Sequence, residues 1–266
     1  MDIYHSGREI SPDYASVVIP VYNQLEHTRV CFDSLSEHTR YPWRLIVVDN
    51  GSSDGTGEYL AERAAECDHL TVITNEENAG FTLAVNQGME AADGRHVVLL
   101  NNDTTVTPGW LMGLVMLAES DDRIGLVGPK ILHPETGQIR TIGGLVFHMG
   151  GKVSPPPGQD QDAADPRFAE PFECQYVEGS CMLIKRAVID EIGVLDEVFA
   201  PAYYEDTDYC FRAREAGFRI VYSPYSEIYH HSTVTAQAVN AEDPSYAAAA
   251  RRNDMIFKAR WAHRFW

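Results

Sequence analysis

The sequence lacks the features of a membrane-spanning or disulfide-stabilised protein. No apolar run approaches the roughly 20 residues that a helix needs to cross a bilayer, and residues 1–13 lack the basic start and apolar stretch of a secretory signal. The five cysteines are odd in number and show no C-x-x-C spacing. We therefore expect reduced thiols in a cytoplasmic protein, and neither a disulfide framework nor a cysteine-based zinc site.

Positive charge is also scarce in this chain. Lysine and arginine number 21 against 39 aspartates and glutamates, which gives a net charge of −18. A broad phosphate-tracking surface is incompatible with this balance, so we expect no nucleic-acid partner. An anionic small molecule would need a local cation, and a bound metal ion is one way to supply it.

The basic residues that are present gather near the C-terminus. Residues 251–266 carry a local charge of +4, which leaves −22 for the rest of the chain. Phe257, Trp261 and Phe265 recur at i, i+4 and i+8, so a helix here would bear an aromatic stripe beside a basic one. Such a helix either docks its aromatic side chains on the core or contacts an anionic membrane surface, as a peripheral protein at the inner face would.

Short apolar runs alternate with helical patterns over the first half of the chain. We predict strands at 16–21, 45–48, 70–74 and 96–100, and helices at 26–37, from 56, at 82–92 and at 108–120. Fully apolar strands that alternate with helices predict an α/β fold, in which both faces of a parallel sheet are covered. The 266 residues, 44% of them hydrophobic, suffice for one large domain or one domain with an appendage.

The alternation changes after residue 120. We predict strands at 124–128, 139–147, 176–184, 220–222 and 228–230, and helices at 186–192 and 206–216, the second ended by Gly217. Residues 150–171 are rich in glycine, proline and aspartate and predict a long irregular loop. Loops of this length in a compact domain are usually functional.

Several polar residues fall at or just after the ends of predicted strands, namely Tyr22, Asp49, Asn78 and Asp103. Open parallel sheets bind ligands at these carboxyl ends. Asp49 precedes a glycine-rich turn and either accepts hydrogen bonds from a nucleoside or closes the turn through its own backbone. This turn matches neither G-x-G-x-x-G nor G-x-x-x-x-G-K-[ST], so the phosphate-cradling loops of those motifs are not supported.

Acidic residues form two candidate sites. Asp103 either holds Mg²⁺ together with diphosphate oxygens or ends its strand in a turn. Glu205, Asp206 and Asp208 lie within four residues, and acids this close repel one another unless a cation or a proton transfer justifies them. One of them would be a general base, or Asp206 and Asp208 merely stabilise the start of a helix.

Two histidines, His230 and His231, follow a short apolar strand. Adjacent side chains on a strand face opposite sides, so we expect at most one to reach a metal ion. A lone histidine is more often a hydrogen-bonded structural residue. A carboxylate partner such as Asp103 would reverse that preference, because imidazole with carboxylate suits Mn²⁺ or Mg²⁺.

Seven segments occur in a familiar order over residues 16 to about 235. They are residues 18–23, 47–56, 78–88, 99–104, 178–186, 203–212 and 228–230. In this order they resemble the inverting family-two glycosyltransferases of the GT-A fold, particularly the rhamnosyltransferase-like and galactofuranosyltransferase-like members that build bacterial surface polysaccharides.

The resemblance implies a fold and a domain organisation. The fold would be α/β of the GT-A, Rossmann-like type, a three-layer sandwich with a mostly parallel central sheet. A glycosyltransferase domain would span residues 1–235, with a nucleotide-binding half over about 14–120 and an acceptor and catalytic half over about 121–235. Residues 236–266 would form a C-terminal helical segment on the domain or on a membrane surface. Some relatives continue beyond this point, so the chain is a candidate for an excised domain.

The resemblance also implies roles for single residues on the donor side. Asp103 and His230 would bind Mn²⁺ or Mg²⁺, with Asn101 in place of the first acid of the family's D-x-D motif. Residues 231–233 depart from the commoner pattern after the histidine. The residues that would bind the nucleotide-sugar are Pro20, Tyr22, Asn23, Asp49, Asn78, Gly80, Asn86, Asn101 and Asn102.

On the other side of the site, Asp206 falls where the family places its catalytic base, with Glu205 beside it. Gly179, Ser180 and Asp208 would lie on the acceptor side. The implied reaction moves a sugar from a UDP- or dTDP-sugar to a hydroxyl of a glycan or lipid-linked acceptor. Asp206 would deprotonate that hydroxyl for in-line attack with inversion, and the metal would neutralise the leaving diphosphate.

Two other functions stay open on the sequence. Asn101 and the residues after His230 leave room for a non-catalytic nucleotide-sugar-binding domain of a polysaccharide assembly complex, against which the intact Glu205-Asp206 pair argues. A nucleotidyltransferase would have a glycine-rich loop with basic residues near the first strand, where this chain has Asn23-Gln24-Leu25.

Overall fold

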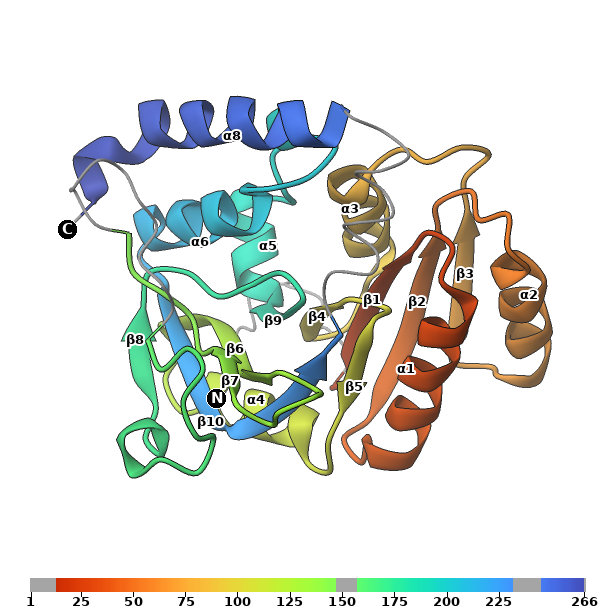
Figure 1. Cartoon of the computed structure of the whole chain (residues 1–266), viewed down its shortest axis with the longest axis horizontal. Coiled ribbons are helices and arrows are strands. Elements are labelled where there is room, and N and C mark those ends of the chain that lie inside the picture. The colour runs from red at the N-terminus through yellow and green to blue at the C-terminus, as the bar shows by residue number, and fades with distance from the viewer. Residues whose placement is uncertain (1–12, 147–156, 232–244, 266) are drawn as a thin grey trace, which may run out of the picture.

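The computed structural model describes residues 13–146, 157–231 and 245–265. Its described strands form one sheet, whose main path runs in the order β3-β2-β1-β4-β9-β6-β10-β5 (Figure 1). Strand β7 pairs with β6, and β8 pairs with β10. The strands are β1 (Ala15–Val21), β2 (Trp43–Asp49), β3 (Leu70–Thr74), β4 (His96–Leu100), β5 (Thr104–Val106), β6 (Ile124–Leu132), β7 (Ile139–Thr141), β8 (Phe172–Cys174), β9 (Cys181–Lys185) and β10 (Arg219–His230).

Most strands of the main path run in one direction. The pairs β1–β2, β2–β3, β1–β4 and β6–β10 are parallel. Strand β9 is antiparallel to both of its neighbours, β4 and β6, so these two share a direction. Only β9 and β5 of the described main path therefore run the opposite way. The predicted mostly parallel central sheet is confirmed.

Helices cover both faces of the sheet, as the predicted three-layer sandwich requires. Val17, Ile19 and Val21 on β1 join the apolar cluster that includes α1, α2 and α4, whereas Val18 joins the cluster that includes α3, α5, α6 and α8. This alternation follows from the two-residue period of a strand. The helices are α1 (Leu25–His38), α2 (Thr56–Glu66), α3 (Phe81–Ala91), α4 (Trp110–Ala118), α5 (Arg186–Ile192), α6 (Glu205–Glu215) and α8 (Ser245–Trp261).

Close packing of α3 on the sheet depends on a glycine. A Cβ atom at Gly88 would lie 2.2 Å from Cγ1 of Val18 on β1 and 3.4 Å from Cγ2 of Val48 on β2. The first distance is far below van der Waals contact, so a larger residue would push the helix away from the strands. Gly88 thereby fixes the height of α3, whose amino end borders the site described below.

The second half differs from the sequence prediction in several elements. Strand β9 begins at Cys181 and not at Tyr176, because the Cys181 N–H donates to the Glu178 carbonyl in a turn. The two strands predicted at 220–222 and 228–230 are one strand, β10, with a register shift between Ser223 and Glu227. The strand predicted at 139–147 is only β7, and residue 147 lies outside the described part of the chain.

Other differences concern short elements and loops. Strands β5 and β8, of three residues each, were not predicted. The helix predicted at 108–120 is the shorter α4. Residues 150–156 of the predicted irregular loop lie outside the described residues, and the remainder contains the 3-10 helix η1 (Pro166–Phe168). Two further 3-10 helices are η2 (Glu197–Phe199) and η3 (Ala262–Arg264).

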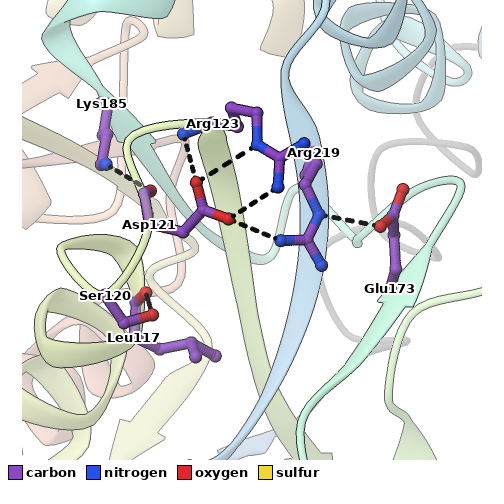
Figure 2. Close-up of polar contacts among 7 residues, drawn as sticks. All are labelled: Leu117, Ser120, Asp121, Arg123, Glu173, Lys185 and Arg219. Atoms are coloured by element: carbon purple, nitrogen blue, oxygen red, sulfur yellow. Dashed lines mark hydrogen bonds and ion pairs between the residues drawn. The ribbon is translucent and has the colours of Figure 1, made fainter.

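A cluster of charged residues joins Glu173 of β8 to the starts of β6 and β10 (Figure 2). The Asp121 carboxylate accepts hydrogen bonds from the Arg123 backbone N–H at 2.9 Å and from Arg219 Nη1 at 2.9 Å. Arg219 also pairs with Glu173 at 2.9 Å, and Lys185 Nζ donates to the Asp121 carbonyl at 3.1 Å. The hydrogen bonds from Arg123 lower the pKa of Asp121 to about 2. This network anchors the ends of β6 and β10 that lie away from the site.

None of the helices in the described part of the chain has the length and apolarity needed to cross a membrane. Helix α8 instead turns its aromatic residues into the protein: Phe257 is 1% exposed and Trp261 is 7% exposed. Their rings pack around Phe211 of α6, at centroid distances of 5.2 and 5.5 Å. In contrast, Arg251 and Met255 are exposed on the other face of α8.

Candidate active site

A cavity of about 300 Å³ lies beyond the carboxyl ends of β1, β4 and β10. This is where the reversal of strand order in an open α/β sheet leaves room for a ligand. The wall combines residues of these strand ends with residues of the loops after β2 and β3 and of the loops before β9 and α6. The starts of α3 and α6, strand β7 and helix α8 contribute one residue each. The lining residues are Pro20, Val21, Tyr22, Asn50, Asn78, Phe81, Asn101, Asn102, Asp103, Arg140, Glu178, Ser180, Ala202, Tyr203, Glu205, His230 and Tyr246.

Several buried polar atoms of this wall have no hydrogen-bond partner among the described residues. They are Asn101 Oδ1, Glu178 Oε2, Ser180 Oγ, Glu205 Oε2 and His230 Nδ1. Buried polar groups in folded proteins are nearly always paired, because an unpaired one loses its hydration without compensation. Their convergence on one cavity indicates a ligand rich in hydrogen-bonding groups. Three of them are oxygens of amide or carboxyl groups, which can accept hydrogen bonds from hydroxyl groups.

Asp103 and His230 meet at one end of the cavity. Asp103 follows β4, His230 ends β10, and Oδ1 lies 3.1 Å from Nε2. The antiparallel pairing of β10 with β5, in which His230 faces Thr104, brings them together. Burial would raise the pKa of Asp103, but the hydrogen bond and charge of His230 outweigh it and hold this pKa below 3.8. The carboxylate is therefore ionised.

The adjacent histidine points elsewhere. His231 Nε2 lies 3.0 Å from Thr105 Oγ1, outside the cavity wall. Its backbone N–H donates to the Asp103 carbonyl at 2.8 Å, which closes the strand end around the acid. As the alternation of a strand predicts, only one of the two histidines lies beside Asp103.

The geometry of this pair fits a divalent metal ion. Two ligands at roughly 2.1 Å from an octahedral ion, at right angles to each other, lie about 3 Å apart, close to the observed 3.1 Å. Carboxylate with imidazole is a suitable donor set for Mn²⁺. Among the described residues, no group of three or more histidine, cysteine, aspartate or glutamate side chains could hold a metal. The pair could thus supply two ligands, with further ligands from bound substrate or water.

The acids Glu205 and Asp206 begin α6, and they differ in surroundings. Glu205 is 5% exposed and lines the cavity. Asp206 is outside the lining, but its Oδ2 accepts from the Gly179 N–H at 2.9 Å, and Gly179 lies between the lining residues Glu178 and Ser180. A Cβ atom at Gly179 would lie 3.2 Å from Asp206 Cβ, so a side chain there would require Asp206 to shift by a few tenths of an ångström.

Burial raises the pKa of both acids, but to different extents. The pKa of Glu205 rises well above 4.5, because burial and the charge of Asp206 both disfavour its ionised form. Burial also raises the pKa of Asp206, but N–H groups of Gly179 and Thr207 donate to it and favour the carboxylate. Asp206 is therefore the more readily ionised of the two.

Asn50, which the sequence analysis did not single out, organises the opposite wall. Its Nδ2 donates to Asn78 Oδ1 at 2.8 Å, and its Oδ1 accepts from the Ala79 N–H at 3.0 Å. Asn75 Nδ2 donates to the same oxygen at 3.0 Å. These bonds fix the loop before α3 against the end of β2. The position of Asn50, two residues after the strand predicted at 45–48, was a signal that could have identified it.

Asp49 and Asn23 lie beside the cavity and outside its lining. Asp49 is 2% exposed, and its Oδ1 accepts from the Ser52 N–H at 3.0 Å, as the turn-closing alternative predicted. Asn23 holds the same turn: its N–H donates to Ser52 Oγ and its Oδ1 accepts from the Ser53 N–H, both at 2.8 Å. The two residues therefore hold the turn after β2 beside the segment that carries Tyr22.

Gly80 is also outside the lining, at the amino end of α3. It has φ +90°, and a Cβ atom there would lie 2.6 Å from Pro201 Cβ. The absence of a side chain therefore lets α3 approach the loop that carries Ala202 and Tyr203.

Two residues expected in the site are bound elsewhere. Both amide atoms of Asn86 bond the backbone of Leu195, each at 2.9 Å, and no atom of Asn86 lines the cavity. Asp208 faces α8, where its Oδ1 accepts from Arg260 Nη1 at 2.9 Å and Trp261 Nε1 at 2.7 Å. The reason is helical geometry: two residues turn a helix by about 200°, so Asp208 and Asp206 project from opposite faces.

Further lining residues escaped the sequence analysis. Arg140 of β7 lies 3.3 Å from Glu178, as an ion pair within the wall. Glu178 and Phe81 fall inside segments 178–186 and 78–88, which carried the family resemblance, so their positions beside predicted site residues could have identified them. Arg140 and Tyr246 had none, because a short strand and a distant helix bring them to the cavity.

Comparison with known proteins identifies a sequence family for most of this chain. The family model described as "Glycosyl transferase family 2" matches residues 16–193. N-acetylglucosaminyl-diphospho-decaprenol L-rhamnosyltransferase of Mycobacterium tuberculosis is 28% identical over 93% of this chain and 84% of its own length. "Uncharacterized protein y4gI" of Sinorhizobium fredii is 30% identical over 92% of this chain, and O-antigen biosynthesis protein RfbC of Myxococcus xanthus is 26% identical over 87%. The chain spans only 27% and 18% of these last two proteins.

Solved structures share the fold at low sequence identity. GalNAc-T7, crystallised with UDP, GalNAc and Mn²⁺, superposes with a TM-score of 0.68 at 20% identity, over 81% of this chain and 42% of its own. The mannosyltransferase PcManGT of Pyrobaculum calidifontis, in complex with GDP-Man and Mn²⁺, gives a TM-score of 0.61 at 18% identity, over 83% of this chain and 57% of its own.

Proposed function

The chain belongs to glycosyl transferase family 2 and has the GT-A fold, and from this we propose that it transfers a sugar from a UDP- or dTDP-sugar to a hydroxyl of a glycan or lipid-linked acceptor, with inversion. One observation carries the proposal beyond the family. Five buried polar atoms that have no hydrogen-bond partner within the described part of the chain converge on the cavity that contains the Asp103–His230 pair. A hydroxyl-rich sugar attached to a diphosphate would satisfy both features.

The donor would lie between the ends of β1, β2 and β4. We assign the nucleoside to the side formed by Pro20, Tyr22 and Asn78, with Asp49 and Asn23 behind these lining residues. We assign the diphosphate to the segment from Asn101 to Asp103. Asp103 and His230 would hold Mn²⁺ or Mg²⁺, which when bound neutralises charge on the leaving diphosphate. GalNAc-T7 and PcManGT were both solved with Mn²⁺ bound, and this supports the choice of metal.

Asp206 is our candidate for the general base. Its pKa lies above the usual 3.8, so it binds a proton more tightly than a free aspartate does, yet its N–H donors keep it easier to ionise than Glu205. The acceptor oxygen would attack the anomeric carbon, its proton would pass to Asp206, and the bond from that carbon to the diphosphate would break. Because the base must be ionised, activity is lost as pH falls through the raised pKa.

The neutral form of Glu205 would have a different task. A protonated carboxyl in the wall can donate one hydrogen bond and accept others. We propose that Glu205 binds a sugar hydroxyl, together with Ser180 on the acceptor side. The predicted division of residues 1–235 into a nucleotide half and an acceptor half is part of this proposal.

The names of two relatives, an L-rhamnosyltransferase and an O-antigen biosynthesis protein, support a role in bacterial surface polysaccharide synthesis. We propose that this occurs in the cytoplasm, at the inner face of the membrane. Because Phe257 and Trp261 are buried, contact with lipid through residues 251–266 would use exposed basic side chains such as Arg251.

A screen of nucleotide-sugar donors, followed by kinetics of a variant that lacks the proposed general base, tests the function. UDP-, dTDP- and GDP-sugars are first compared by thermal shift with and without Mn²⁺, and transfer is then measured with the donor that binds. We expect Asp206→Asn to lower kcat about 10²- to 10⁴-fold, the usual contribution of a general base, with donor affinity nearly unchanged. Glu205→Gln is the matched control, and we expect it to keep most of kcat.

Each other outcome has a defined meaning. If turnover survives Asp206→Asn but is lost in Glu205→Gln, Glu205 is the base. Donor binding without hydrolysis or transfer across many acceptors would favour the alternative, a non-catalytic nucleotide-sugar-binding domain of a polysaccharide assembly complex.

A further inference from the structure

Helix α8 lies alongside α6 (Figure 1), and it packs in the same apolar cluster as α3, α5 and α6. It follows the region matched by the family model, which ends at residue 193. One face of α8 is buried at spacings of three and four residues, as expected for a helix that packs on a core. The residues of this face are Tyr246, Ala249, Asn253, Phe257 and Trp261.

Asn253 is polar, yet it lies in the middle of this face with an exposed fraction of 0%. Its Nδ2 atom is 2.6 Å from the carbonyl oxygen of Phe199 and 2.9 Å from those of Ala202 and Tyr203. The two N–H groups of one amide thus serve three carbonyls of the loop before α6. Other residues of α8 bond the same segment: Asp254 accepts from the Tyr204 hydroxyl at 2.8 Å, and Arg252 donates to the carbonyls of Val198 and Ala200.

This loop has a backbone that needs external support. Tyr203 and Tyr204 are consecutive and have φ of +80° and +73°. L-residues with large side chains disfavour this left-handed region, and it persists when surrounding contacts fix it. The next residues are Glu205 and Asp206, so the direction in which both acids project depends on this turn.

The loop also forms part of the cavity. Ala202, Tyr203 and Glu205 all belong to the lining, and Tyr246 reaches it from α8 itself. Displacement of the loop by an ångström would therefore move one wall and both acids together. In contrast, Asp103 follows β4 and His230 ends β10, so neither belongs to the loop that Asn253 bonds.

We propose that Asn253 is a positioning residue for sugar transfer. Through its three hydrogen bonds it holds residues 199–204 in the left-handed turn that aims Glu205 and Asp206. This inference rests on the proposed function of the cavity. It adds that α8, outside the family match, is required to orient the acids, whereas the donor's metal and diphosphate contacts do not depend on it.

Two variants of Asn253 test the inference by kinetics. Asn253→Asp keeps the size of the side chain but has no N–H to donate, and Asn253→Ala removes the amide. Tyr222→Phe is the control, because it deletes a buried hydrogen bond to the Phe168 carbonyl, 3.0 Å long, from a residue that does not line the cavity. Kinetics are measured well below the melting temperature, per site that binds donor.

We expect both Asn253 variants to lower kcat about 10- to 100-fold, the effect of a misplacement near 1 Å, with a much smaller change in donor Kd. The control should lose thermal stability and keep kcat. A purely structural role would reduce the number of binding sites and leave kcat per site intact. Unchanged kcat per site in Asn253→Asp would overturn the inference.

Hydrogen–deuterium exchange gives a readout independent of activity. We expect faster exchange confined to residues 199–205 in Asn253→Asp, and no change there in Tyr222→Phe. If the wild-type protein transfers no sugar, the proposed function fails, and the positioning role in sugar transfer fails with it. If the wild type is active but exchange at 199–205 is unchanged in Asn253→Asp, the inference about Asn253 alone is wrong.

Discussion

The acids of the cavity show how neighbours decide what a buried carboxyl group can do. Asp103 and Glu205 are about equally buried, but Asp103 faces His230 and Glu205 faces the charge of Asp206. The first neighbour favours the carboxylate and the second favours the neutral acid. One cavity thus offers an ionised group suited to a cation and a neutral group suited to a hydroxyl.

The contact between Asp103 and His230 leads to a prediction about nucleotide binding. Asp103→Ala removes one of the two proposed metal ligands, so we expect affinity for the nucleotide in the presence of Mn²⁺ to fall by at least about tenfold, or about 1.4 kcal/mol. Without Mn²⁺ the wild type and the variant should bind alike. Isothermal titration calorimetry measures both conditions, and equal affinity in Mn²⁺ would remove Asp103 from the metal site.

The raised pKa of Glu205 predicts a pH-dependent gain in stability for Glu205→Gln. The unfolded chain ionises this group near 4.5, whereas the folded protein ionises it only well above that value. Below about pH 4.5 both states are protonated and the residue has no effect. At higher pH the unfolded state gains from ionisation, so the wild type loses stability that the neutral variant keeps.

Thermal unfolding of the two proteins checks this. The melting temperature of Glu205→Gln should match the wild type near pH 4 and exceed it increasingly as the pH rises towards the raised pKa of Glu205 in the folded protein. A difference that is constant with pH would mean that Glu205 is ionised in the folded protein.

The sequence could identify some site residues and could not orient them all. Asp103 and His230 each follow an apolar run, so both were found, but their pairing depends on the three-residue strand β5. Asn86 and Asp208 occupy the expected sequence positions, yet their side chains bond Leu195 and α8. A motif fixes where a residue is in the chain, and the direction of its side chain depends on tertiary packing.

Helix α8 contributes to the site although it lies far along the chain from most of the lining residues. Phe257 packs between Tyr204 and Phe211, with ring centroids 5.4 and 5.2 Å away. Phe257→Ala should therefore lower the free energy of unfolding by about 3–5 kcal/mol, as for other large core truncations. Met255 is 65% exposed, so Met255→Ala should change the free energy of unfolding by no more than about 0.5 kcal/mol.

Urea unfolding of both variants makes this comparison. Equal effects at the two positions would mean that α8 does not pack on the core through Phe257.

Elements with a strong pattern were predictable, and elements that depend on partners were not. Strand β4 has the predicted bounds, because all five of its residues are buried. Strand β10 was predicted as two pieces, since the polar segment around Ser226 hides its continuity beside β6. Strands β5 and β8 are too short for periodicity to register, and only pairing with β10 makes them strands.

For the whole molecule, the net charge of −18 governs long-range encounters. A nucleoside diphosphate approaches a like-charged protein, so its association should be slowed by repulsion that salt screens. We expect the association rate of the donor, at saturating Mn²⁺, to rise between about 0.02 and 0.2 M NaCl. Stopped-flow fluorescence measures it, with the uncharged nucleoside as a control that should show little dependence. A rate that falls with salt would indicate a cationic approach path.

The cavity draws on residues far beyond the family match. That match ends at residue 193, yet Ala202, Tyr203, Glu205, His230 and Tyr246 complete the lining. A hybrid of two relatives joined at that limit would combine the proposed nucleotide side of one parent with the proposed catalytic acids of the other. A graft intended to exchange sugar preference should therefore include all residues up to the end of α8, because residues on both sides of position 193 form one cavity wall.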